Sequence, residues 1–258
     1  MRALLIALAL PLVACASGDT TPEAPGPSAP TPAPDATVAV EADSIVLEDP
    51  ARRLTVRVLY PVVTGDVPAR DAVNEQLMLA ADGAWREMAP EAPLGPDAPS
   101  FERYDFDGGF EVAHADEEVV SVLQSMWVYS GGAHGNTFFL PQTYDLGTGR
   151  PLALADVIRT TPEALGVLRD AVIRGLVAEA AERFETTAAD ARTSLWLDDV
   201  TATPEAFEGI WTLGPDGLTV HYAPYAVSAY AAGSWHVTVP YAELTGHLGP
   251  ASARIAAM

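Results

Sequence analysis

Strand candidates outnumber helix candidates in this chain, and the two kinds of element do not alternate. In residues 54–60, for example, apolar residues recur at alternate positions, which is the spacing of a half-buried strand. Only residues 70–88 and 162–185 repeat apolar residues every three to four positions over the length of a helix. This pattern predicts an α+β fold, with helices packed on one face of a mostly antiparallel sheet.

Proline and glycine set the expected ends of the strands. Pro61 is expected to end the second strand, because proline donates no hydrogen bond to a sheet. The sequence Asp107-Gly108-Gly109 predicts a turn between two short strands. The strands are therefore expected at residues 37–47, 54–60, 101–104, 110–114, 119–129, 137–144, 211–222 (a hairpin with its turn at 214–217) and 235–239.

Each of the two helices is expected to bury one apolar stripe. The second helix begins with a predicted capping box, in which Thr160 caps the N-terminus and Glu163 completes the box, and Pro162 suits the first turn. The stripe of the first helix is Val73, Leu77, Ala81, Trp85 and Met88. The stripe of the second helix is Leu165, Leu168, Val172, Leu176, Ala180 and Phe184.

The first residues resemble the export signal of a bacterial lipoprotein. Arg2 precedes an apolar run that is shorter than the ~20 residues needed to span a bilayer. The run ends in Leu12-Val13-Ala14-Cys15, which resembles a lipobox and contains the only cysteine of the chain. We therefore expect residues 1–14 to be a signal peptide and Cys15 to carry the acyl chains of a membrane anchor. The alternative is a buried cysteine in an N-terminal helix.

The segment after the lipobox is expected to be a tether. Residues 17–37 are rich in Pro, Ala and Thr and contain almost no large apolar side chain, so burial cannot offset the entropy of ordering them. Ala16, rather than an aspartate, follows the cysteine, which favours the outer membrane, with the protein facing the periplasm. We expect the tether at residues 15–37, two subdomains at 38–158 and 159–250, and a tail at 251–258.

The chain is strongly acidic. All 14 basic residues are arginine and stand against 35 acidic residues, which gives a formal net charge of −21. Nucleic-acid binding needs basic side chains that neutralise phosphates, so no nucleic acid is expected as a partner. The same charge argues against docking on anionic lipids through a basic patch. A single cysteine also excludes a disulfide framework and a cysteine-rich zinc site.

No motif for catalysis or cofactor binding is recognisable in the sequence. The five histidines show neither an H-x-H nor an H-E-x-x-H spacing, and there is no G-x-S-x-G elbow and no P-loop. We therefore expect no catalytic residue, metal or cofactor. The acidic runs 116–118 and 198–199 are expected on solvated faces or in turns, with a catalytic carboxylate pair as the alternative.

Two segments contain candidate binding residues. The first is the loop at residues 130–136, whose glycines are expected to be structural because they allow unusual backbone angles. These glycines are Gly131, Gly132 and Gly135. His134 is either a turn residue or a functional one, and Tyr129 and Asn136 are the binding candidates beside it.

The second segment is dense in aromatic residues. Such residues form either a recognition surface or the core of a sheet, and both interpretations apply here. The aromatic-rich set comprises Tyr222, Pro224, Tyr225, Tyr230, Trp235 and Tyr241, and its candidate anchors are Tyr222, Tyr225 and Tyr230.

Several motifs resemble a known pair of domains. YSGGAHGN and YDLGTGRPLALADVI lie within residues 121–158, and DGLTVHYAPYAVSAYAAGSWHVTVPYAEL spans residues 216–244. With Tyr60-Pro61 and VNEQL at residues 73–77, they resemble the paired extracytoplasmic domains of unknown function in the anti-sigma factor RsiV. The first of these domains also occurs in the peptidoglycan deacetylase PdaC. The resemblance covers about residues 44–248 and implies an α+β fold of two intimately packed subdomains in the cell envelope.

The resemblance favours a non-catalytic binding module of the bacterial envelope that captures an envelope protein or a cell-wall glycan. It brings no catalytic residue, because the deacetylase chemistry of PdaC lies in a separate domain. RsiV binds lysozyme, so the resemblance implies a basic, lysozyme-like protein or peptidoglycan as the partner. Two alternatives are a cell-wall hydrolase or its accessory subunit, with His134 as a catalyst, and a structural acidic lipoprotein of a salt-adapted bacterium.

Overall fold

The computed structural model describes residues 38–92, 95, 97–99, 102–198 and 203–258. Residues 36–258 form one compact unit. The predicted signal peptide, Cys15 and the predicted tether lie outside the described residues, and so does Asp199 of the second acidic run. In the part of the chain that is described, no helix combines the length and the apolar character needed to cross a membrane.

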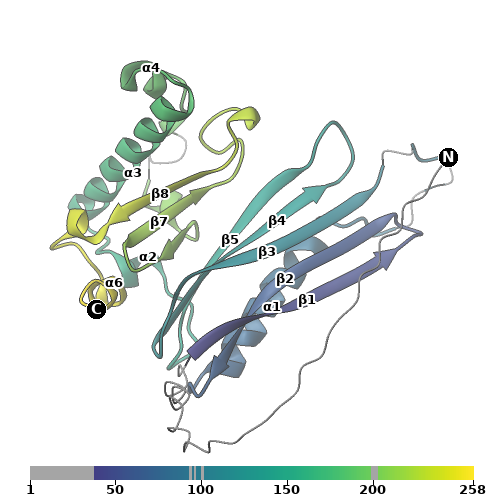
Figure 1. Ribbon diagram of the computed structural model, residues 1–258, viewed down its shortest axis with the longest axis horizontal. Helices are drawn as coiled ribbons and strands as arrows, with labels where there is room; N and C mark the ends of the chain where they lie inside the picture. Colours follow the sequence, from purple (N-terminus) through teal and green to yellow (C-terminus); the bar gives the residue numbers. More distant parts are fainter. Residues whose placement is uncertain (1–37, 93–94, 96, 100–101, 199–202) are drawn as a thin grey trace, which may run out of the picture. The chain divides into compact units, whose positions relative to one another are not determined.

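Two β-sheets form the framework of this unit (Figure 1). The five-stranded sheet has the order β1-β2-β3-β4-β5 and the three-stranded sheet the order β6-β7-β8. Among the described strands, only β2 and β3 pair in parallel, and all other pairs are antiparallel. The strands are β1 (Val38–Asp49), β2 (Leu54–Gly65), β3 (Tyr104–Ala115), β4 (Val119–Tyr129), β5 (Asn136–Asp145), β6 (Trp211–Leu213), β7 (Gly217–Tyr222) and β8 (Trp235–Pro240). The predicted α+β fold with a mostly antiparallel sheet is confirmed.

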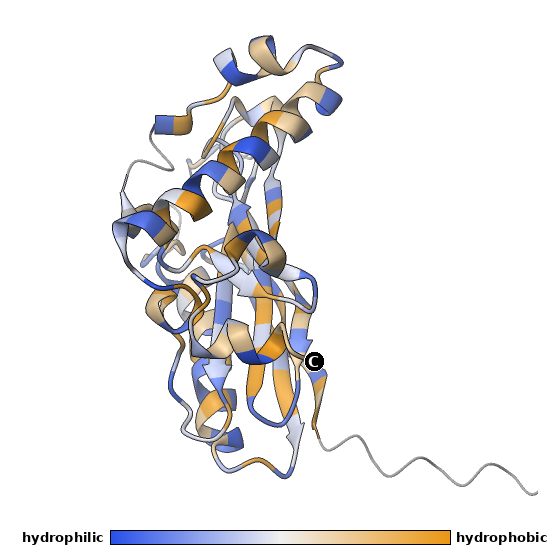
Figure 2. Ribbon diagram, turned by 90° about the vertical axis from the view of Figure 1, so that its left-hand side faces the viewer, coloured by the Kyte–Doolittle hydropathy of each residue, from blue (hydrophilic) through white to orange (hydrophobic). Residues whose placement is uncertain are grey.

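One long helix packs on each sheet. Helix α1 (Arg70–Arg86) lies against β2, and helix α3 (Pro162–Arg183) lies against β8. Figure 2 shows bands of hydrophilic and hydrophobic residues along α3, with hydrophobic residues concentrated on the strands. The shorter elements are α2 (Leu154–Val157), α4 (Ala188–Thr193), α6 (Pro250–Ile255), η1 (Pro204–Phe207), η2 (Tyr230–Ala232) and η3 (Tyr241–Leu244).

Both predicted helices form, and most of each predicted stripe is buried. Val73, Leu77, Ala81 and Trp85 of α1 are buried, and so are Leu168, Val172, Leu176 and Ala180 of α3. The predicted cap is wrong by one residue: Thr161 rather than Thr160 accepts the N–H of Ala164. Phe184 does not belong to the stripe. It follows the last helical residue and is 39% exposed.

Pro61 does not end its strand, because the sheet is incomplete on one side at this position. β3 pairs with β2 only from Leu54 to Val58, so no strand lies beside Pro61 on that side. The lack of an N–H at Pro61 therefore costs no hydrogen bond to β3. Farther along, the backbone of Val63 exchanges two hydrogen bonds with the side chain of Asn74 from α1, at 2.8 and 2.9 Å. β2 therefore continues to Gly65.

The predicted turn Asp107-Gly108-Gly109 is also wrong, because these residues lie inside the single long strand β3. A Cβ atom at Gly108 would lie only 2.9 Å from a methyl group of Val58 on β2. Glycine at this position therefore allows two strands to approach each other closely, rather than allowing the chain to reverse.

Strand β4 is buried on both faces, which explains its nearly continuous apolar sequence. It contacts the three-stranded sheet as well as its own neighbours. The buried hydroxyl of Ser121 accepts the N–H of Leu213 in β6 at 2.9 Å and lies 2.7 Å from the hydroxyl of Thr143 in β5. A buried polar contact thus joins the two sheets.

The C-terminal residues predicted as a tail are mainly helical. Helix α6 buries Ile255, which is 4% exposed. Arg254 of the same helix donates to both carboxylate oxygens of Asp116, which lies between β3 and β4. The contact spans 138 positions of sequence, which is why local sequence patterns did not indicate it.

The predicted subdomain boundary at residues 158 and 159 falls between α2 and α3.

Candidate functional site

The ends of two hairpins meet on the surface and bring together three of the predicted binding residues. In Figure 1 the β4–β5 and β7–β8 connections lie at the same end of their sheets. The ring of His134 stacks on Tyr230, with 3.9 Å between centroids and an interplanar angle of 20°. Tyr225 lies 5.3 Å from Tyr230 and 6.5 Å from His134. We call His134, Tyr225 and Tyr230 the loop aromatic cluster.

One backbone carbonyl group holds the cluster together. The hydroxyl of Tyr230 donates to the carbonyl oxygen of Gly135 at 2.8 Å. Nδ1 of His134 lies 2.8 Å from the same oxygen, and because a carbonyl oxygen can only accept, Nδ1 carries a proton in this contact. Two rings from different hairpins are thus tied to one point of the β4–β5 loop.

The loop glycines have two different structural roles. Gly131 and Gly132 have φ values of +90° and +95°, which glycine adopts readily and other residues rarely do. Gly135 is required for another reason, because a Cβ atom there would lie 2.4 Å from the ring of Trp127. A glycine at each of these three positions therefore suits the backbone and packing of the loop.

Tyr225 is held in a strained backbone conformation. Its φ is +73°, which is unusual for a bulky residue and costs about 1–3 kcal/mol. Its side chain is nevertheless 50% exposed, so burial offsets little of this cost. Strained residues of this kind are concentrated at functional sites.

More aromatic residues lie beside the cluster on β4. Trp127 is 37% exposed and stacks on Tyr129, with 6.3 Å between centroids and an angle of 14°. The hydroxyl of Tyr129 donates to the carbonyl oxygen of Gly132 at 2.9 Å. The guanidinium carbon of Arg103 lies 4.8 Å from the Tyr129 ring centroid, a cation–π distance. Tyr129 is therefore a buried residue that holds the loop through its hydroxyl group and does not form part of the loop surface.

Not all predicted anchors are on the surface. Tyr222 is only 3% exposed, because β7 is the central strand of its sheet and is covered on both faces. Trp235 and Tyr241 are likewise buried. Of the two interpretations of the aromatic-rich segment, the core applies to these residues and the surface to Tyr225. Asn136 is half-buried, and its Oδ1 has no hydrogen-bond partner among the described residues.

A buried histidine pair escaped the sequence analysis. His221 and His236 are opposite each other in β7 and β8, with 2.8 Å between their Nδ1 atoms, and Nε2 of His221 lies 2.8 Å from the hydroxyl of Thr212. Burial, and next the neighbouring His236, lower the pKa of His221 to about 3. The register of the β7–β8 pair would have been needed to find this contact.

Within the described ranges, no group of three or more His, Cys, Asp or Glu side chains is arranged to hold a metal.

Residues 160–242 match the family model described as "Protein of unknown function (DUF3298)". The chain is also similar to two solved structures of DUF3298 family proteins. The one from Bacteroides fragilis is 21% identical, with a TM-score of 0.62, over 87% of this chain and 100% of that chain. The one from Pseudomonas aeruginosa is 17% identical, with a TM-score of 0.54, over 83% of this chain and 94% of that chain. At these identities the likeness concerns the fold.

No curated protein sequence matches the chain. The family model and the two solved structures nevertheless agree on the same class of domain. The predicted resemblance to a pair of domains of unknown function is therefore confirmed, and residues 160–242 are the segment that matches the DUF3298 family.

Proposed function

We propose that the protein is a lipid-anchored, non-catalytic binding module of the bacterial envelope that captures a basic protein through the loop aromatic cluster. The observation that carries this proposal is the half-exposed, strained Tyr225 in ring contact with His134 and Tyr230. Exposed tyrosines with restrained rings lose little entropy on binding and are frequent hot spots of interfaces.

The charge of the chain supports a basic partner. With 35 acidic residues and 14 arginines, the protein attracts cationic proteins from a distance. One acidic side chain lies beside Trp127, since Asp107 of β3 is paired with Trp127 of β4 and is exposed. We propose a lysozyme-like muramidase as the first partner to test, because such enzymes are strongly basic and the resemblance to RsiV points to one.

The anchor is part of the same proposal. The lipobox-like Leu12-Val13-Ala14-Cys15 supports acylation at Cys15, and two or more acyl chains give stable attachment to a membrane. Extended residues of the Pro-rich segment each span about 3 Å, so residues 16–37 would hold the binding surface tens of Å from the membrane. Acyl labelling of the wild type and of Cys15→Ala tests the anchor, and equal labelling of both would contradict it.

A titration with lysozyme tests the binding role. Residues 16–258 are titrated at about 0.1 M and about 0.3 M salt, because salt screens long-range attraction but not a buried aromatic contact. Specific binding persists at the higher salt, and Tyr225→Ala weakens it by about tenfold or more, as expected for a hot spot. Leu59→Ala is the matched control: Leu59 is 49% exposed and lies on β2. Binding that vanishes at the higher salt, or that Tyr225→Ala leaves unchanged, overturns the proposal.

A cell-wall glycan is the second candidate ligand. The exposed ring of Tyr225 and the stacked ring of His134 present aromatic faces on which the apolar face of a sugar can lie. Purified muropeptides that compete with lysozyme for the protein, and whose affinity falls in Tyr225→Ala, would favour this ligand. Muropeptides that bind without sensitivity to Tyr225→Ala would exclude the cluster as a glycan site.

A further inference from the structure

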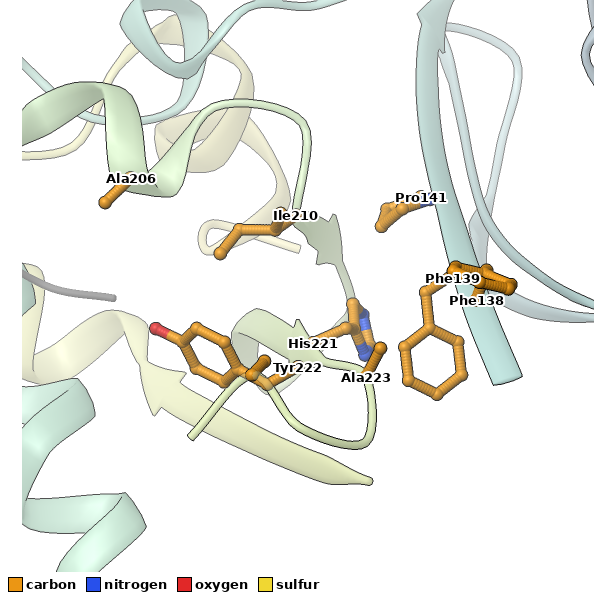
Figure 3. A pocket seen from close by; sticks show the side chains of 9 residues that line it. Phe138, Phe139, Pro141, Ala206, Ile210, His221, Tyr222 and Ala223 are labelled. Carbon is orange, nitrogen blue, oxygen red and sulfur yellow. The ribbon is translucent and has the colours of Figure 1, made fainter. Parts of the chain in front are cut away.

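A cavity of about 290 Å³ lies between the two sheets, and the buried histidine pair is part of its wall. His221 of β7 and His236 of β8 are directly opposite each other, with 5.1 Å between their ring centroids. Phe139 of β5 lies 5.1 Å from the ring of His236 and 6.3 Å from that of His221. Figure 3 shows the imidazole of His221 directed from β7 toward this phenylalanine. Glu111 of β3 also lines the cavity.

The spacing of the two Nδ1 atoms matches one coordination geometry. These atoms of His221 and His236 are 2.8 Å apart. Histidine binds a divalent metal at about 2.0–2.1 Å, so two nitrogens at a right angle are about 2.8–3.0 Å apart and two at the tetrahedral angle about 3.3–3.4 Å. The observed spacing is that of neighbouring ligands in a square plane, the arrangement that Cu(II) prefers. Without a metal, the same spacing suits an N–H···N hydrogen bond, which holds the two rings in place.

The neighbours of His221 suit a ligand that binds through Nδ1. Such a ligand carries its proton on Nε2 and donates it to an oxygen atom, which fixes the ring. Nε2 of His221 lies 2.8 Å from the hydroxyl oxygen of Thr212, a residue that is itself only 2% exposed. His236 is exposed, so an ion can reach the pair from solvent on that side.

The charge beside the pair favours a cation. Desolvation lowers the pKa of His236, and the carboxylate of Glu111 opposes this change because it stabilises positive charge at the ring. A metal ion at the same place would gain from the same carboxylate. Arg183 acts in the opposite direction, but it is not among the described residues that line the cavity.

We propose that His221 and His236 bind one Cu(II) ion through their Nδ1 atoms, in a square plane that water molecules complete. Imidazole nitrogen suits copper, and Cu(II) binds such ligands more tightly than Ni(II) or Zn(II). The two histidines are 15 positions apart in the sequence, so no short motif indicates them. The site is separate from the loop aromatic cluster, none of whose three residues is among the described lining residues.

Titration of Cu(II) into residues 16–258 tests the proposal. This part of the chain contains no cysteine, and it is prepared without a histidine tag, so that neither a thiol nor a tag competes for the ion. We expect one tightly bound Cu(II) per chain, with an electron paramagnetic resonance spectrum that shows coupling to two imidazole nitrogens. Zn(II) should bind more weakly, because tetrahedral coordination requires the two nitrogens to move apart.

The variant His236→Gln removes the exposed ligand. We expect it to weaken Cu(II) binding by about a hundredfold, because loss of a ligand costs more than the roughly tenfold that loss of a residue orienting a ligand can cost. His247→Gln is the matched control, since His247 is half-buried and is not among the described residues that line the cavity. It should leave the affinity and the spectrum unchanged.

The role of Thr212 as a positioning residue is tested in the same titration. Thr212→Val should weaken Cu(II) binding roughly tenfold or more, and Thr212→Ser, which keeps the hydroxyl, should restore it. A loss of packing alone would not be rescued by serine. Cu(II) that binds the wild type no more tightly than His236→Gln, or a spectrum with fewer than two imidazole nitrogens, would overturn the proposal.

Discussion

At the scale of single residues, Tyr225 couples stability to the proposed binding role. Its φ of +73° is strained for tyrosine and ordinary for glycine. We expect Tyr225→Gly to raise the free energy of unfolding by about 0.5–1 kcal/mol, measured by urea denaturation, while lysozyme binding falls. Leu59→Gly, at a position without positive φ, is the control and should destabilise. A loss of more than about 1 kcal/mol in Tyr225→Gly would mean that the strain is absent or offset by ring contacts.

The glycines of the β4–β5 loop should respond differently to the same substitution. In Gly135→Ala the new methyl group would meet the Trp127 ring, 2.4 Å from the position of its Cβ, so the indole must move. We expect a loss of about 1–3 kcal/mol together with a change in tryptophan fluorescence. In Gly132→Ala the Cβ has open space but the φ is +95°, so stability should fall with no fluorescence change. Identical spectra for the two variants would contradict this assignment of roles.

The residues of the candidate site could be predicted only in part. His134 was indicated by its position in a loop, where functional residues concentrate, and Tyr225 and Tyr230 were indicated by the aromatic-rich segment to which they belong. The burial of Tyr222 was not predictable, because it depends on the second layer that covers β7. The strained backbone of Tyr225 could not be predicted either, because no turn signature in the sequence requires a positive φ at that residue.

At the scale of elements, Asp116 connects the C-terminal helix to the β3–β4 turn. It accepts hydrogen bonds from Arg254, from His114 and from the backbone of the turn. Burial alone would raise the pKa of Asp116, but these hydrogen bonds outweigh it and hold that pKa well below its usual range. Arg254 also pairs with Glu118, so one arginine neutralises two acids of this turn.

This network predicts acid sensitivity with a definite sign. Because the pKa of Asp116 is depressed in the folded protein, its contribution to stability is present above about pH 4, the unfolded pKa, and is lost as the pH falls below that value. Asp116→Asn should therefore cost about 2 kcal/mol at neutral pH and flatten the loss of stability below about pH 4. Urea denaturation across this range measures both. An unchanged acid slope in Asp116→Asn would show that other carboxylates dominate.

The elements divide clearly into predictable and unpredictable ones. Helices α1 and α3 and strand β4 followed from local patterns, because each helix buries one apolar stripe and β4, which is buried on both faces, is apolar along nearly its whole length. The errors at Pro61 and at Asp107-Gly108-Gly109 have one cause. The effect of a proline or a glycine depends on the neighbouring strand, and β2 and β3 are parallel neighbours whose paired residues, such as Leu54 and Tyr104, lie 50 positions apart in the sequence.

At the scale of the whole molecule, the net charge of −21 should make folding salt-dependent. Repulsion among 35 acidic residues opposes the compact state, and salt screens it beyond a Debye length of ~10 Å at 0.1 M. We expect the melting temperature of residues 16–258 to rise as salt is added. Sodium chloride and potassium chloride should act alike, which distinguishes screening from specific ion binding. A flat or falling melting temperature would contradict the prediction.

The central claim is that the loop aromatic cluster is the surface that captures a basic protein. Amide hydrogen exchange of residues 16–258, with and without lysozyme at about 0.3 M salt, tests it most directly. We predict slower exchange on lysozyme addition in residues 130–136 and 223–230, with no change along β1, and loss of this protection in Tyr225→Ala. Protection along β1 and β2 instead, or no protection anywhere, would contradict the claim.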